Sequence, residues 1–119
     1  MVQDEATRAI HGRLEACRLA VEYVALVTPA LEVLSRESPA QGKELKRASL
    51  AIHFNVAAAA GKSGAVDQSR CYAVAWGSAM DCGAILDSCR DLGALDEPST
   101  TQGKALLARI VATLAELCR

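Results

Sequence analysis

The sequence predicts an all-α protein: a single domain over residues 1–119 that folds as an up-down-up-down antiparallel four-helix bundle. Alanine is abundant, 51% of the residues are hydrophobic and only 3% are aromatic, a composition that favours closely packed helices over sheets. Apolar residues recur at spacings of three and four along four segments, which short clusters of helix-breaking residues separate. A chain of 119 residues is long enough to bury one core.

The first helix is expected over residues 4–34 and carries two neighbouring apolar rows. The spacing indicates that the first row is buried; it comprises Ile10, Leu14, Cys17, Val21, Val24 and Leu31. The second row comprises Leu19, Tyr23, Leu26 and Ala30 and exceeds the single stripe that such a bundle needs. Pro29 lacks a backbone donor and should kink the helix in its last third.

The second helix is expected over residues 39–60, with Ser38 as its cap and Pro39 as its first residue. The residues of its buried face are Leu45, Ala48, Ile52, Val56 and Ala59. Asn55 shares this face. We therefore expect it to hydrogen-bond across the bundle and fix the helix register. The alternative is that its side chain faces a ligand.

The third helix is expected over residues 66–92, with a heptad seam of mostly small residues. The seam comprises Cys71, Ala75, Ser78, Cys82, Ile85, Cys89 and Leu92. Small side chains let helix axes approach toward the lower end of the usual ~8–10 Å range, and the cysteines are interpreted as small buried hydrophobes rather than redox groups. The fourth helix is expected over residues 99–118, after Gly93 has ended the third and with Ser99 and Gln102 as a capping box.

Several helices carry more apolar surface than one bundle core requires, which predicts a homo-oligomer. The residues expected at the oligomer interface are Leu19, Tyr23, Leu26, Tyr72, Trp76 and Met80.

The sequence contains no recognisable catalytic, cofactor or metal signature. AAAAGKS resembles part of a phosphate-binding loop, but Val56 replaces its first glycine and no strand precedes it, so a helix end at Gly61 is the expected structure. His11 and His53 lack partners at metal-ligating spacing, and none of the five cysteines forms a C-x-x-C pair. We expect a cytoplasmic protein that is not an enzyme, binds no metal or cofactor and does not enter membranes.

The charge balance gives little support to a nucleic-acid-binding role, since 13 basic and 14 acidic residues leave a net charge of −1. The basic residues that do gather in the sequence are Lys43, Lys46, Arg47, Lys62 and Arg70. Their ordinary interpretation is a solvated helix face. The functional alternative is a modest phosphate-contacting patch on the second helix and the start of the third.

Three stretches resemble a known family: LKRASLAIHFNVAAAAGK, AVAWGSAMDC and LGAL. The chain is similar to the four helix bundle proteins, which are S23-like proteins encoded in intervening sequences of bacterial 23S ribosomal RNA genes. Asn55, Ala75, Gly77 and Ser78 fall on the family's motifs, whereas His53 stands where proline is usual, Ala58 and Ala59 replace a Glu-Gly pair, and Asp81 replaces glutamate.

The resemblance implies a left-handed bundle that assembles as a ring-like pentamer and has no established catalytic activity. A related branch, the accessory proteins of diversity-generating retroelements, binds nucleic acid and a reverse transcriptase through a basic surface. The resemblance also implies a structural role for Gly77 and Ser78, where a backbone approaches closely. The leading hypothesis is a non-catalytic homo-oligomeric scaffold; the alternative is a nucleic-acid-binding accessory protein.

Overall fold

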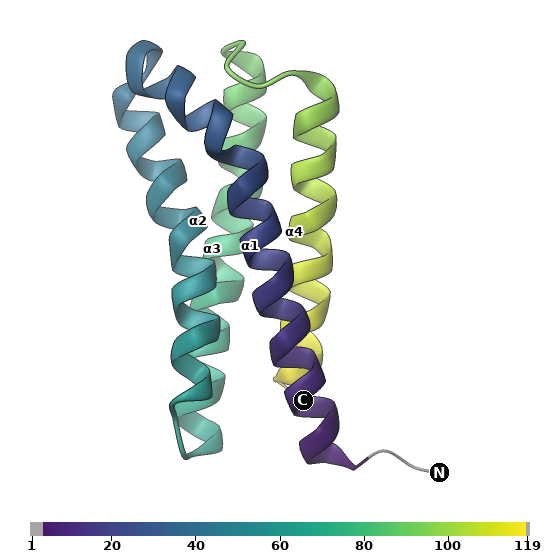
Figure 1. Ribbon diagram of the computed structural model, residues 1–119. Helices are drawn as coiled ribbons and strands as arrows, with labels where there is room; N and C mark the ends of the chain where they lie inside the picture. The colour runs from purple at the N-terminus through teal and green to yellow at the C-terminus, as the bar shows by residue number, and fades with distance from the viewer. Residues whose placement is uncertain (1–3, 119) are drawn as a thin grey trace.

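The structure, a computed structural model, describes residues 4–118, which form four helices joined by short turns (Figure 1). The helices are α1 (Glu5–Glu37), α2 (Pro39–Ala60), α3 (Ala65–Asp91) and α4 (Glu97–Leu117). Each helix packs extensively on two others in the cyclic order α1, α2, α3, α4, so that α1 and α3 lie on one diagonal of the bundle. The predicted up-down-up-down four-helix bundle is confirmed. Residues 1–3 and 119 of the predicted domain lie outside the described part.

The helices end close to the predicted breaks, but the residue that caps α4 differs from the predicted one. α2 has the predicted ends, whereas α4 begins at Glu97, two residues before the predicted start. The carboxylate of Asp96 accepts a hydrogen bond of 2.7 Å from the backbone N–H of Ser99. Asp96 is therefore the N-terminal cap, and the capping box predicted at Ser99 is wrong because Ser99 already lies in the first helical turn. Gly93 ends α3 as predicted, with φ at +80°.

α1 continues through Pro29 to Glu37, three residues beyond the predicted end. The last turns of α1 incline toward the start of α2 in Figure 1, as expected for a helix that contains proline. Only Ser38 separates the two helices, so the chain reverses direction within a single residue.

α1 buries the second of its two neighbouring rows, whereas the spacing predicts that the first is buried. Leu19 and Tyr23 are fully buried and Ala30 is 2% exposed, whereas Leu14 of the row predicted to be buried is 63% exposed. Both rows satisfy helical spacing, so periodicity alone does not distinguish them. The row that lies inward is flanked by the small residues Ala16 and Ala20, and both of these are fully buried.

The buried faces of the other helices largely agree with the prediction. All five residues of the predicted α2 face are fully buried: Leu45, Ala48, Ile52, Val56 and Ala59. On α3, Ala75, Ser78, Cys82 and Cys89 of the predicted seam are buried, but Leu92 is 58% exposed because it lies beyond the last residue of the helix.

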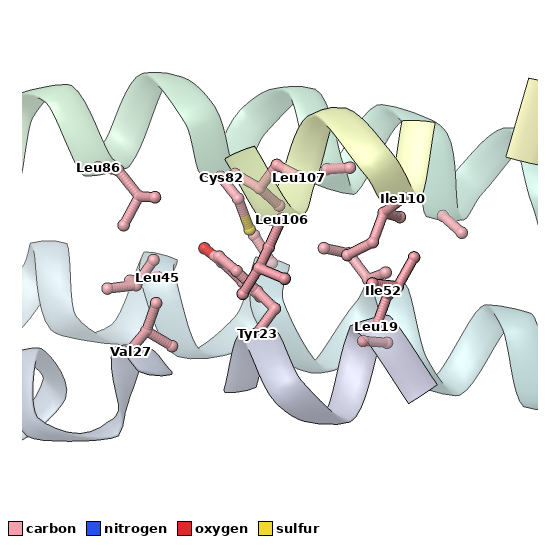
Figure 2. Packing of buried hydrophobic residues seen from close by; sticks show 14 of the residues in the cluster. Leu19, Tyr23, Val27, Leu45, Ile52, Cys82, Leu86, Leu106, Leu107 and Ile110 are labelled. Carbon is pink, nitrogen blue, oxygen red and sulfur yellow. The ribbon is translucent and has the colours of Figure 1, made fainter. Parts of the chain in front are cut away.

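A small polar cluster lies in the middle of this core, where α1, α2 and α3 meet. The Ser49 hydroxyl and the Cys82 sulfur are 3.7 Å apart. The Tyr23 hydroxyl lies beside Cys82 (Figure 2), but among the described residues it has no hydrogen-bond partner. Burial raises the pKa of the Tyr23 hydroxyl and of the Cys82 thiol, since an apolar environment disfavours their charged forms.

α4 approaches the rest of the bundle closely at Gly103. A methyl group at this position would lie 2.8 Å from Cδ1 of Leu86 on α3 and 3.3 Å from Cδ2 of Leu26 on α1. Glycine at this position therefore lets α4 pack closely against both neighbouring helices.

Candidate functional site

The outward side of α1 carries an apolar stripe that lies mostly outside the core, which we call the α1 face; of its residues, Cys17 also packs against the core. The stripe consists of Ile10, Leu14, Cys17, Val21 and Val24. Ile10, Leu14 and Val21 are 48%, 63% and 56% exposed. Cys17 is half-buried, and burial raises the pKa of its thiol although the Arg13 guanidinium opposes this shift. The stripe contains no charged side chain and follows heptad spacing.

The α1 face leads into a groove between the second half of α1 and the first half of α2, with a volume of about 890 Å³. Val24, Val27 and Leu31 from α1 and Leu50 from α2 are among its apolar lining residues. Its polar lining residues include Glu32, Lys43 and Lys46. The groove is thus apolar inside and carries charges of both signs.

A second stripe lies on the outward side of α3, which we call the α3 face. It consists of Val66, Ala73, Trp76, Gly77, Met80 and Ala84. Val66, Trp76 and Met80 are 68%, 45% and 52% exposed. A methyl group added at Gly77 would meet no described atom within 4 Å, so the backbone of α3 is accessible there.

The predicted oligomer interface requires correction. Leu19 and Tyr23 are fully buried and Tyr72 is only 3% exposed, so all three belong to the core of a single chain and are not available to a second copy. Leu26 is partly buried beside Gly103. The remaining two members, Trp76 and Met80, lie at the surface on the α3 face.

The regular spacing of Ile10, Leu14 and Val21 predicts a buried row, whereas all three side chains lie at the surface. The candidate interface on α1 is therefore the row of Leu14 and not the row of Tyr23.

The residues predicted to set helix register have different environments from those expected. The Asn55 amide donates a 2.8 Å hydrogen bond to the carbonyl oxygen of Ala51, one turn earlier in α2, rather than bonding across the bundle. Ser78 is buried at 7% exposure. Gly77 is on the opposite, outward side of α3, so no close backbone approach within the chain explains this glycine.

The structure does not bring the predicted basic residues into one patch. Lys43 and Lys46 lie near the start of α2, and Lys62 follows its end, about 24–28 Å away along the helix axis. Arg47 forms an ion pair with Glu44 at 3.1 Å. Arg70 is exposed on α3.

Within residues 4–118, no three His, Cys, Asp or Glu side chains are grouped closely enough to hold a metal ion. The helices of this same part of the chain include none with the combined length and apolar character that a membrane span requires. Gly61 ends α2 in a right-handed conformation and α3 begins only at Ala65, so the GKS stretch forms the turn between two helices, as predicted.

Comparison with solved structures finds one protein with the same fold. A crystal structure of a protein of unknown function from the S23 ribosomal protein family of Bacteroides thetaiotaomicron superposes with a TM-score of 0.75. The match covers 91% of this chain and 98% of that chain, at 15% sequence identity. No protein-family model matches the sequence, and no curated protein matches it. At this identity the similarity establishes a shared fold, the one that the family resemblance implies.

Proposed function

We propose that the protein is a non-catalytic cytoplasmic scaffold that assembles from identical subunits, five in a ring as the family resemblance implies. The observation that carries the proposal is the pair of apolar faces on α1 and α3, which a single chain leaves open to solvent. Exposed apolar stripes of this kind mark protein–protein contact sites, although the α3 face also includes the exposed Arg70 between Val66 and Ala73.

Light scattering at micromolar protein concentration tests the proposal. A pentamer has five times the chain mass of 12.5 kDa, or about 62 kDa. A mass of one chain would refute the scaffold hypothesis.

The alternative is a nucleic-acid-binding accessory protein. The observation in its favour is that Lys43 and Lys46 are exposed and form no ion pair within residues 4–118, so repetition around an oligomer would place several such pairs together. A gel shift with structured RNA and duplex DNA at near-physiological salt distinguishes the two roles. If no gel shift occurs, or if replacing Lys43 and Lys46 leaves the shift unchanged, only the scaffold hypothesis remains.

A further inference from the structure

We propose that the groove between α1 and α2 binds a small amphipathic anion, a carboxylate with an unbranched alkyl chain of medium length. The groove belongs to a single chain, so the proposal goes beyond assembly. It lies at the end of the bundle where the last turns of α1 meet the start of α2 (Figure 1). Its volume of about 890 Å³ is within the range of roughly 300–1,000 Å³ for sites that hold small molecules.

The interior of the groove is aliphatic. Val27 at its floor is fully buried, Leu31 packs partly buried against the core, and Leu50 lines the α2 side. None of the described residues that line the groove is aromatic, so it offers no ring on which a nucleic-acid base would stack. A flexible alkyl chain is therefore the apolar group that suits this lining.

The side-chain donors that the groove offers to a ligand are its two lysines. The hydroxyls of Thr28 and Ser35 donate to backbone carbonyl oxygens of α1 at 2.8 and 2.7 Å, and the Ser49 hydroxyl belongs to the buried polar cluster. Lys43 and Lys46 are exposed and form no ion pair within residues 4–118. Because a lysine lays its aliphatic stem along apolar surface and keeps its ammonium group in water, both cations lie at the rim of the groove.

The charges around the groove favour an anion with a single charge. No side chain caps the start of α2, and its first turn contains no acidic residue, so the positive end of this helix remains uncompensated. Pro39 and Ala40 of this turn line the groove. Glu32 is the one acidic residue among the described lining, and with Lys43 and Lys46 it leaves a net charge of +1. This charge matches a carboxylate rather than a phosphate ester, which carries about −1.5 to −2 at pH 7.

The length of the groove sets the length of the alkyl chain. α2 rises about 10 Å from Lys43 to Leu50 at 1.5 Å per residue. An extended alkyl chain advances about 1.25 Å per carbon, since its bonds are about 1.5 Å long and meet near the tetrahedral angle. A carboxylate beside Lys43 thus reaches Leu50 with a chain of about eight or nine carbons. Decanoate has a chain of this length and serves as the probe.

Isothermal titration calorimetry with decanoate, below the concentration at which it forms micelles, tests the proposal. We expect saturable binding to the native protein. Replacing Lys43 and Lys46 together by glutamine should weaken the affinity about tenfold, since two exposed charge pairs are lost. Glu32→Gln should strengthen it about threefold, because a repulsive charge is removed. Lys62→Gln removes a cation outside the groove and is the matched control, with unchanged affinity.

Two further variants separate the groove from the core and from assembly. Leu50→Glu places a charge on the lining and should abolish binding; Leu50 is outside the core cluster, and circular dichroism verifies that the variant is folded. If it is not, the variants of the exposed lysines and of Glu32 still decide. Leu14→Asp charges the α1 face, where it should block assembly, but Leu14 does not line the groove. This variant should bind decanoate like the wild type, so failure of the proposed function and failure of this inference are distinct results.

Several results would overturn the inference. These are the absence of saturable binding, an unchanged affinity after both lysines are replaced, or loss of binding in Leu14→Asp. Decyltrimethylammonium has an alkyl chain of similar length but a cationic head, so an affinity equal to that of decanoate would also overturn it. Amide chemical shifts of the Leu14→Asp variant locate the ligand: decanoate should perturb residues 24–35 and 39–50, whereas changes centred on Trp76 and Met80 would place it on the α3 face instead.

Discussion

Two glycine substitutions, one on the outward side of the bundle and one on its buried side, should differ in their effect on the free energy of unfolding. Alanine is about 1 kcal/mol more favourable than glycine inside a helix. At Gly77 the added methyl group meets no described atom within 4 Å, so Gly77→Ala should stabilise the single chain by about this amount.

At Gly103 the same gain in helix propensity is opposed by crowding. The methyl group would lie 2.8 Å from Leu86, which is fully buried and can move only if the core repacks. Overpacking of a core typically costs about 1–3 kcal/mol. Gly103→Ala should therefore leave the chain unchanged or destabilise it by up to about 2 kcal/mol.

Urea unfolding followed by far-UV circular dichroism measures both values. The Leu14→Asp background keeps assembly from contributing to the comparison. We expect the two variants to differ by about 1–3 kcal/mol. If Gly103→Ala raised the free energy of unfolding as much as Gly77→Ala does, the close packing of α4 on Leu86 and Leu26 would be refuted. In the wild-type background Gly77→Ala should also weaken assembly, since it fills the space offered to a neighbouring copy.

Three further predictions concern the polar cluster and the cysteines. Tyr23→Phe should raise the free energy of unfolding by about 1 kcal/mol in urea titrations, because it removes a buried hydroxyl without a partner; a loss of stability would show that the hydroxyl is bonded. Burial raises the pKa of the Cys82 and Cys89 thiols above the ordinary 9.0, so the folded state holds these protons more tightly than the unfolded state. Stability should thus be unaffected below pH 9 and decline above it, by at most about 1.4 kcal/mol per pH unit for Cys82; a flat profile to pH 10.5 (about one and a half units higher) would contradict this. A thiol reagent should label exposed Cys118 rapidly and fully buried Cys82 slowly, and equal rates measured by mass spectrometry would disprove the burial of Cys82.

The sequence was sufficient for the fold because its signals agree with one another. Helical spacing is unambiguous on α2, whose predicted face from Leu45 to Ala59 is fully buried. Proline and glycine mark the helix ends at Pro39 and Gly93. Local and long-range preferences point to the same structure in these segments, which makes such a bundle predictable.

The candidate interface was harder to predict because α1 satisfies the same spacing twice. Choosing between the row of Leu14 and the row of Tyr23 requires knowing which side faces α2, α3 and α4, and that depends on packing between helices. The predicted hydrogen bond of Asn55 across the bundle is absent for a related reason, because its side chain donates to a carbonyl oxygen of its own helix at 2.8 Å. Spacing predicts that a helix has apolar faces, while tertiary packing determines which face remains outside.

The mass of the native protein in solution, measured by light scattering on three versions of the chain, tests the central claim most directly. We expect the wild type and Leu92→Asp to share an oligomeric mass, about 62 kDa for a pentamer of 12.5 kDa chains, and Leu14→Asp to be a monomer. Leu92 is the matched control, being 58% exposed like Leu14 at 63% but outside both faces. A monomeric wild type, or a Leu14→Asp variant with the wild-type mass, would contradict the account.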